Sequence, residues 1–476
     1  MKNKHVDKIK RYGGAALGSL LLTGCATVPR QGGFKSAAAM ARQRTGATVI
    51  WDQNTKADQR VHAVVGKLLA QALTAHAAVQ IALLDNPNLQ AQYEQLGVSQ
   101  ADVVQAGLLS NPIFNFDIRF PAAPFHGWDA SVAQNFLDIL LLPTRGKIAA
   151  AQFAATKDQV SNAVVMMAQR TRAAYYRLVG DQQMVALESR IKQGAAAQLD
   201  LAKKLRQAGN TPPIAYDQHL TLYEHIRLQL AMDKATVLED HERLNAMMGL
   251  WGKEGNWTVP ARLAVPPAHN LSLKGLESLA IKQSLSLVAA RQRLRADAVA
   301  LRISGIAGLL PGAGIGLDYV RDPDVRGTLG PAISVPIPIF NQGQPQVAIA
   351  TAQYRMAYRR YQAAAIRIRA KVREAWIAMH AAQQEVLFYQ RIMLPLRKRM
   401  VNETQLAYNG MYVSGFVLMQ AKQAEIDTAR HYVQTLQRFW LARERLRQVL
   451  GGMLPAENDQ THKTEPTHPH KEKQKC

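Results

Sequence analysis

The most constraining feature of the chain is a long helical stretch over residues 144–211, bounded by Pro143 and Pro212. No proline interrupts it, and mostly apolar or small residues recur at alternating spacings of four and three between positions 160 and 185. This seam is typical of a helix that packs lengthwise against another helix. A helix of this length would measure about 100 Å. Since that is several times the diameter of an ordinary domain, we expect a rod or a tube rather than one compact core.

The same seam recurs 201 residues later. Between residues 148–190 and 349–391, 11 of 43 aligned positions are identical. We therefore predict two structural copies of one unit, each of about 200 residues. The first repeat covers 71–251, with a helix, a β-hairpin over 112–138, a long helix over 144–208 and a return helix over 214–249. A linker over 252–270 precedes the second repeat over 271–452, with a helix, a hairpin over 313–337, a long helix over 345–410 and a return helix over 417–450.

The N-terminus has the layout of a secretory signal peptide, with a basic start followed by a short apolar run over residues 13–22. It ends in Leu22-Thr23-Gly24-Cys25, which resembles the bacterial lipobox. This resemblance implies cleavage after residue 24, a covalent lipid (palmitate or another acyl chain) on Cys25, and sorting to the outer membrane. An ordinary signal peptide with an incidental cysteine is the alternative.

The ends of the mature chain carry less information. We interpret residues 25–70 as a lipidated N-terminal arm and residues 453–476 as a polar, disordered tail. With Cys25 acylated, Cys476 is the other cysteine of the chain, so no intrachain disulfide can form.

The chain is strongly basic, with a formal net charge of +23. Its basic residues are scattered along helical segments without a clustered block, which favours a solvated helix face over a nucleic-acid site. Outside the N-terminal run, no apolar stretch of about 18 residues is present to form a spanning helix. Any passage across a membrane must therefore be made of strands.

Four short segments have the period-two pattern of amphipathic strands. They cover residues 114–120, 128–136, 315–320 and 329–335, and they form two hairpins. We expect one face of each strand to meet lipid and the other to meet water, because the opposite phase would bury charges in hydrocarbon at several kcal/mol each. The residues expected to face water are Asn115, Asp117, Arg119 and Asp318. Those expected to face lipid are Phe114, Phe116, Ile118, Phe120, Ile315, Leu317 and Tyr319.

Four strands cannot close a membrane barrel, which must have no backbone edge exposed to lipid. Two chains would supply eight strands and too narrow a pore, while three would supply twelve and leave room for a lumen. The sequence thus predicts a mainly α fold with a small β part, in which identical chains share one wall.

Several short motifs occur in a defined order along this pattern. They are Gly107-Leu108-Leu109-Ser110-Asn111-Pro112 before the first hairpin, Pro338-Ile339-Phe340-Asn341-Gln342-Gly343 after the second, Leu394-Pro395 in the second long helix, and Tyr408-Asn409-Gly410 at its tip. In this order and spacing, over roughly residues 70–451, the chain resembles the TolC family of outer-membrane efflux proteins, in its lipoprotein branch.

The resemblance implies a homotrimer with a twelve-stranded β-barrel in the outer membrane and an α-helical barrel in the periplasm. Such proteins are passive exit ducts for drugs, metals, other small solutes or type I secretion substrates. Their partners are a periplasmic adaptor (a membrane fusion protein) and, through it, an inner-membrane pump. No nucleic acid and no cofactor beyond the lipid on Cys25 are implied.

The resemblance also implies that the two helix–turn–helix tips close the periplasmic entrance and dock the adaptor. The corresponding residues are Gly209, Asn210, Thr211 and Pro212 in the first repeat, and Gly410, Met411, Tyr412, Val413 and Ser414 in the second. Gly410 is expected at the position equivalent to Gly209. The alternative is that both sets are ordinary turn residues.

Two rival classes are weighed against this interpretation. The chain has no P-loop, HExxH, paired CxxC or GxSxG motif, so we expect no enzyme, no catalytic residues and no metal site. The stronger rival is a lipid-anchored periplasmic coiled-coil scaffold or adaptor without a pore, which would lack amphipathic hairpins.

Overall fold

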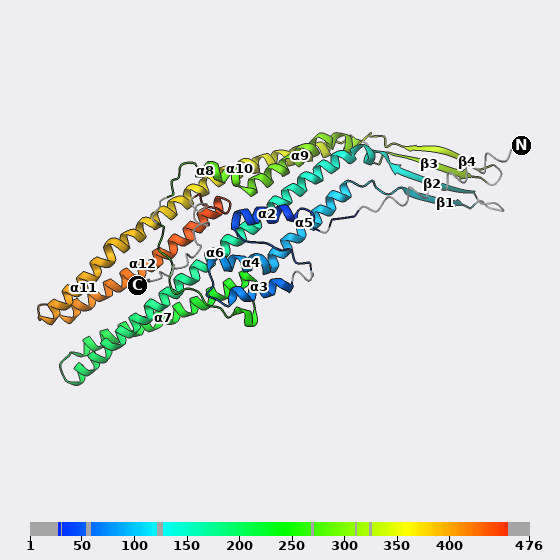
Figure 1. Ribbon diagram of the computed structural model, residues 1–476. Helices are drawn as coiled ribbons and strands as arrows, with labels where there is room; N and C mark the ends of the chain where they lie inside the picture. Colours follow the sequence, from blue (N-terminus) through cyan, green and yellow to red (C-terminus); the bar gives the residue numbers. More distant parts are fainter. Residues whose placement is uncertain are drawn as a thin grey trace, which may run out of the picture. The chain divides into compact units, whose positions relative to one another are not determined.

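The structure is a computed structural model in which residues 27–29, 31–53, 59–120, 127–267, 271–309, 312–322 and 326–455 are described. The predicted signal peptide, Cys25 and nearly all of the predicted C-terminal tail lie outside these residues. The described chain is mainly helical and contains one small antiparallel sheet of four strands (Figure 1). This confirms the predicted combination of long helices with a small β part.

The elements follow one another in the order helices, hairpin, long helix, return helix, and then again. The first series is α2 (Phe34–Thr45), α3 (Gln59–Leu69), α4 (Ala75–Asp85), α5 (Pro87–Ala106), β1 (Ile113–Arg119), β2 (Gly127–Asn135), α6 (Phe136–Gln207) and α7 (Pro213–Met248). The second is α8 (Leu276–Gln283), α9 (Leu285–Leu309), β3 (Gly314–Arg321), β4 (Thr328–Ser334), α10 (Gln344–Phe388), a π turn (Tyr389–Met393), α11 (Leu394–Asn409) and α12 (Gly415–Val449). A short 3₁₀ turn, Gly252–Gly255, opens the linker between them.

The chain divides into two compact units. The first, which we call the sheet unit, contains Met1–Lys35, Glu94–Lys157 and Ala290–Arg359, and therefore all four strands. The second, the bundle unit, contains Ser36–Tyr93, Asp158–Ala289 and Arg360–Cys476. The candidate sites below lie either in the sheet unit or in the bundle unit.

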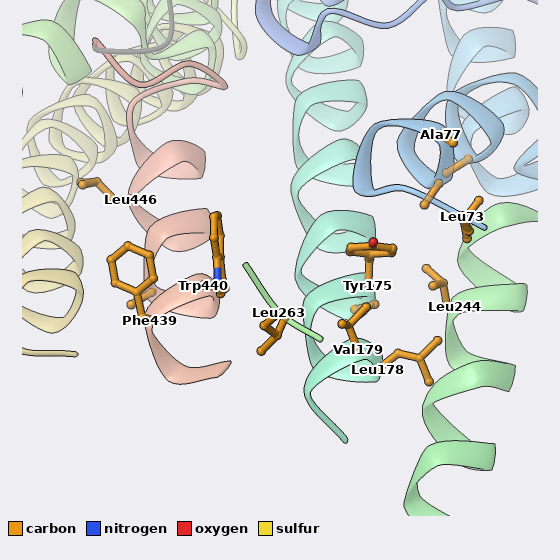
Figure 2. Packing of buried hydrophobic residues seen from close by; sticks show 14 of the residues in the cluster. Leu73, Ala77, Tyr175, Leu178, Val179, Leu244, Leu263, Phe439, Trp440 and Leu446 are labelled. Carbon is orange, nitrogen blue, oxygen red and sulfur yellow. The ribbon is translucent and has the colours of Figure 1, made fainter. Parts of the chain in front are cut away.

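The core of the bundle unit lies where α4, α6, α7, α10 and α12 meet the linker. The predicted seam contributes to it, because Ala174, Leu178 and Val372 are buried there. Figure 2 shows Leu263 of the linker between Trp440 of α12 and Val179 of α6. Burial of these apolar side chains is the main force that holds the long helices together.

Tryptophan and glutamine side chains fasten the linker to the helices. Trp440 Nε1 donates a hydrogen bond to the carbonyl of Ala264 at 2.8 Å, and Trp376 Nε1 donates one to the carbonyl of Leu271 at 2.7 Å. Gln183 Oε1 accepts from the backbone N–H of Leu263 at 2.9 Å. These bonds satisfy backbone groups of a segment without regular secondary structure, which would otherwise be costly to bury.

The described part of the segment interpreted as an N-terminal arm contains helices α2 and α3. Within the bundle unit, Arg172 of α6 donates a hydrogen bond to the carbonyl of Thr45 at 3.0 Å. Gln90 of α5 donates to the carbonyl of Ile50 at 3.0 Å. Trp51 is buried. The part from Ser36 to Trp51 is thus packed within the bundle unit.

The first long helix begins earlier than the sequence indicates. The predicted start at 144 assumed that Pro143 would precede the helix, but α6 starts at Phe136 and contains Pro143 in its third turn. Proline is excluded from helix interiors chiefly by the missing N–H and by a clash with the preceding turn. Here β2 runs into α6 without a loop, and the N–H of Phe136 donates to the carbonyl of Ala313 at 2.9 Å. The predicted hairpin over 112–138 is accordingly too long.

The second half differs from the prediction in a related way. The expected single helix over 345–410 is divided by the π turn just before Pro395, where the sequence indicates a kink. Proline cannot donate the next helical hydrogen bond, and a π turn is one way in which a helix accommodates it. The return helix starts at Gly415 rather than 417, and β4 ends at Ser334 rather than 335, within the predicted hairpin over 313–337. Among the described residues, no helix is both long enough and apolar enough to cross a bilayer.

Candidate functional sites on the sheet and at the helical tips

The register of the sheet gathers apolar side chains on one face. Since facing residues of neighbouring strands share a face, Phe116 lies level with Ala130, which lies level with Tyr319, which lies level with Leu329. The same face carries Phe114, Ile118, Trp128, Val132, Ile315, Leu317, Pro331 and Ile333. Every predicted lipid-facing residue within the strands is on this face, and Phe120 follows the end of β1.

Aromatic rings form a row across this apolar face. The ring centroids of Phe116 and Trp128 are 5.7 Å apart, and those of Trp128 and Tyr319 are 4.9 Å apart. Arg321 is paired with Trp128 at the end of the same row. Trp128 and Tyr319 lie near the hairpin ends of β2 and β3, and Phe116 lies at the centre of β1.

The opposite face is polar. It carries the predicted water-facing residues Asn115, Asp117, Arg119 and Asp318, together with small residues such as Gly316 and Gly330. Arg119 pairs with Asp129 at 2.6 Å and with Asp322 at 3.3 Å. Asn115 Nδ2 donates to Ser131 Oγ at 3.4 Å. Asp117 lies directly opposite Asp129, so the carboxylates on this face outnumber its one arginine.

The outer edges of the sheet have no partner strand in the described part of the chain. The strand order is β1-β2-β3-β4, so β1 and β4 each pair on one side. An edge of this kind presents backbone N–H and C=O groups that can pair with another strand. The two free edges belong to opposite sides of the sheet.

The first helical tip is polar and contains a left-handed glycine. Gly209 follows the end of α6 with a φ of 74°, and the N–H of Asn210 donates to the carbonyl of Leu205 at 2.9 Å. This is the usual glycine-based helix end. Pro213 occupies the first position of α7, where the missing N–H costs nothing. Thr211 and Pro212 complete the turn between the two helices.

In the second tip, Met411 rather than Gly410 takes the left-handed conformation. Gly410 has a φ of −81°, whereas Met411 has a φ of 62°. The N–H of Tyr412 donates to the carbonyl of Ala407 at 2.9 Å, the same bond that Asn210 makes in the first tip. The predicted equivalence of Gly410 with Gly209 is therefore wrong.

The π turn explains this one-residue shift. A π turn accommodates one more residue than the α-helix around it. Before the turn, the identical residues of the two halves are 201 positions apart. After it, the left-handed helix ends Gly249 and Gly451 are 202 positions apart. Met411 follows Gly209 by the same 202 positions.

The second tip is apolar and uncharged over residues 404–421. Met411 is 93% exposed and Tyr412 is 88% exposed. Leu406, Tyr408, Phe416 and Val417 are exposed as well. Val413 and Ser414 lie between these residues and the start of α12. The first tip carries Lys204 and Arg206 instead, of which Lys204 pairs with Asp200 at 2.8 Å. Exposed apolar patches of this kind mark protein contacts more often than water-facing surface.

Sequence reasoning missed three features of these sites: the left-handed Met411, the π turn and the contact of Arg119 with Asp322. The change of repeat offset from 201 to 202 was a signal for the first two. Within the described residues, no group of three or more His, Cys, Asp or Glu side chains could hold a metal.

Comparison with known proteins gives matches among solved structures only. No protein-family model and no curated protein matches the sequence. The structure is similar to that of CusC, described in terms of transmembrane channel formation, with 15% identity and a TM-score of 0.68, over 80% of this chain and 92% of CusC. It is similar to the outer membrane protein VceC of Vibrio cholerae with 16% identity and a TM-score of 0.67, over 79% of this chain and 96% of VceC.

A third match has the same extent. The CmeC outer membrane channel of Campylobacter jejuni shares 14% identity and a TM-score of 0.68, over 79% of this chain and 85% of CmeC. At such identities the similarity establishes the fold and not the activity. Each of these matches extends over most of both chains. The chain therefore has the fold of the TolC-family outer-membrane channels.

Proposed function

We propose that the chain is the outer-membrane channel of a tripartite efflux system. The observation that carries this proposal is the four-stranded sheet, which has one apolar face, one polar face and two free edges. Such a sheet suits a barrel wall between lipid and water, closed by strands from other copies. The shared fold with outer-membrane channels supports the same function.

In this proposal three chains form the barrel and their long helices continue its lumen as a tube. Two repeats within each chain would contribute two strands each to the twelve. The apolar face then meets lipid, and Asn115, Asp117, Arg119 and Asp318 line the water-filled side. The duct is passive and carries drugs, metals or other small solutes.

The test is to purify the protein from membranes in detergent, to determine its mass and shape, and to reconstitute it in planar bilayers. We expect particles of three chains that enclose a hole when viewed by electron microscopy, and conducting channels in the bilayer. A monomer without a hole and without conductance would contradict the proposal and would favour the lipid-anchored scaffold.

The anchor is a separate part of the proposal. Acylation of Cys25 would fix the mature N-terminus in the membrane. Mass spectrometry of the mature protein is expected to show a lipid-modified cysteine at its N-terminus. A chain that remains lipidated after Cys25→Ala would exclude this site.

The tips are the proposed contact with a periplasmic adaptor, and through it with an inner-membrane pump. The exposed apolar residues of the second tip support this assignment. Met411→Glu is expected to abolish co-purification of the adaptor and to remove efflux-dependent resistance. Asn210→Glu in the polar first tip serves as the matched control and is expected to have the smaller effect. Normal assembly with Met411→Glu would show that this tip is an ordinary turn.

A further inference from the structure

An exposed apolar segment continues from the end of β4. In β4, Leu329 and Ile333 lie on the apolar face. Beyond Ser334, the same every-second-residue pattern continues through Val335, Ile337 and Ile339. These three side chains are exposed, and Phe340 is 96% exposed. We call residues 335–340 the apolar extension.

The backbone of the apolar extension has few N–H groups to satisfy. Pro336 and Pro338 have none, and the N–H of Ile339 donates to the carbonyl of Ile337 at 2.9 Å. In hydrocarbon every unsatisfied backbone donor costs several kcal/mol. Irregular backbone is not tolerated in the hydrocarbon core, so a segment with fewer donors than an ordinary loop is suited to the border between hydrocarbon and water.

The far end of the extension is fastened to the helices of the sheet unit. Gly343 has a φ of 84°, and its N–H donates to Asn341 Oδ1 at 3.0 Å. A Cβ at Gly343 would lie 3.2 Å from the carbonyl carbon of Gly308 in α9, so only glycine allows this close approach. The extension is thus held between β4 and the junction of α9 with α10.

The strands alone are short for an outer membrane. A tilted spanning strand needs about 9–11 residues to cover an apolar band of about 25 Å. The strands here contain seven to nine residues, and β4 contains 7. Addition of residues 335–339 to β4 gives an alternating apolar run long enough for the band. For β4, these added residues lie on the side where the helices begin.

We propose that the apolar extension inserts into the lipid bilayer at the helix side of the sheet, with Val335, Ile337, Ile339 and Phe340 in contact with acyl chains. This inference rests on the proposed function, because it requires the sheet to enter a membrane. A second copy of the chain is a poorer occupant. In the proposed barrel, copies would join through the backbone groups of the β1 and β4 edges, whereas the apolar side chains of the extension continue the apolar face of the sheet.

The experiment uses nitroxide spin labels in the full-length protein, reconstituted in vesicles of phosphatidylethanolamine and phosphatidylglycerol. Single cysteines are introduced by Phe340→Cys, Phe116→Cys, Asp117→Cys and Met411→Cys, each with Cys476→Ser to remove the other free thiol. Oxygen partitions into acyl chains and a nickel chelate into water, so the ratio of their collision rates reports which medium surrounds each label. Position 116 samples the apolar face, 117 the polar face and 411 the helical tip.

We expect the oxygen-to-nickel ratio at position 340 to match that at 116 and to exceed that at 411 several-fold. A ratio at 340 equal to that at 411, with 116 in lipid, would overturn the inference and leave the proposed function intact. Protection of 340 from both reagents would overturn it in favour of cover by another copy. Equal water exposure at 116 and 117 would contradict the proposed function itself.

Discussion

At the scale of single residues, Met411 has a backbone conformation that its side chain disfavours. Of the described residues, it alone combines a positive φ with a Cβ. For such a residue the left-handed conformation costs about 1–2 kcal/mol. The first tip avoids this cost with Gly209. The second tip retains it in a residue that is almost fully exposed, so side-chain burial does not compensate.

Met411→Gly is expected to stabilise the second tip by about 0.5–1 kcal/mol, because relief of backbone strain exceeds the added chain entropy of glycine. Hydrogen exchange of the tip amides is the suitable measurement, since it reports local opening. Gly209→Ala is the matched control and is expected to destabilise the first tip. No atom lies within 4 Å of the added Cβ, so any faster exchange reflects the backbone alone.

A buried ion pair joins α6 to α12 within the bundle unit. Arg430 donates to both carboxylate oxygens of Glu188, at 2.5 and 2.8 Å, and Glu188 has a side chain that is 1% exposed. Asp427 also accepts from Arg430, at 3.0 Å. A carboxylate buried in this way is costly to keep charged unless its partner donates these two hydrogen bonds.

Arg430→Ala is expected to reduce the free energy of unfolding by about 3–5 kcal/mol, because it leaves Glu188 charged and buried. Chemical denaturation of the purified protein provides the measurement. The control is Arg438→Ala, which removes a partner of Glu385 at 3.0 Å in a more exposed pair. That change is expected to cost less than about 1 kcal/mol. Equal losses in the two variants would show that burial of Glu188 does not set the strength of its ion pair.

At the scale of elements, the periodicity of the sequence predicts the type and order of the helices and strands better than the residues at which they begin and end. The seam from Val160 and the alternation from Phe114 identify a long helix and a strand, because each pattern reflects a face that must be buried or kept apart from water. Pro143, which lies inside α6, shows where such reasoning stops. A proline interrupts a helix only when the surrounding contacts do not support its continuation, and those contacts are absent from a local pattern.

The tip positions illustrate the same limit for the candidate sites. The sequence identifies Gly410 as a turn residue because glycine is the commonest left-handed residue at helix ends. The π turn about twenty residues earlier shifts the register by one and brings Met411 to that position. Local residue preferences cannot reveal this shift. It is revealed by the corresponding hydrogen bonds of the two tips, from Asn210 to Leu205 and from Tyr412 to Ala407.

The contact between α6, α7 and α12 contains a carboxyl group that titrates unusually high. Burial raises the pKa of Asp181 to about 7, and a hydrogen bond with Asp240 of α7 contributes. Arg177 of α6 and Gln437 of α12 oppose this shift, and Asp240 is also paired with Arg243. An unfolded aspartate titrates near pH 4. The folded state therefore binds an additional proton between about pH 4 and pH 7.

It follows that this group makes the fold less stable as the pH rises from about 4 to about 7, with no further change above that range. Asp181→Asn is expected to remove this part of the pH dependence, so that thermal midpoints of variant and wild type diverge progressively over that window. Thermal unfolding in detergent at a series of pH values provides the test. Parallel curves for the two proteins would show that Asp181 does not titrate there.

At the scale of the whole molecule, the charge of the chain and the charge of the sheet have opposite signs. The formal net charge is +23. The polar face of the sheet nevertheless presents Asp117, Asp129 and Asp318 with Arg119 as its one cation. The net charge of the chain thus has the opposite sign to the charge of the surface that a solute would meet in the proposed barrel. The reason is that alternate residues of each strand lie on opposite faces of the sheet.

A channel lined by this face is expected to prefer cations over anions, since carboxylates attract counter-ions into a confined aqueous path. The double variant Asp117→Asn, Asp318→Asn should weaken the preference, most clearly at low salt where screening is small. The reversal potential in planar bilayers under a salt gradient measures it. Lys204→Gln at the first tip is the control, and an unchanged reversal potential in the double variant would place selectivity outside the sheet.

The unpaired edges of β1 and β4 have a kinetic consequence. A lone sheet with two open edges cannot rest in hydrocarbon, because its outer N–H and C=O groups would lose water without gaining partners. In the proposed channel, entry into the bilayer and association of the copies must therefore occur as one cooperative event. The rate of that event should rise more steeply than in proportion to the amount of chain delivered, and chains delivered too sparsely should wait at the surface.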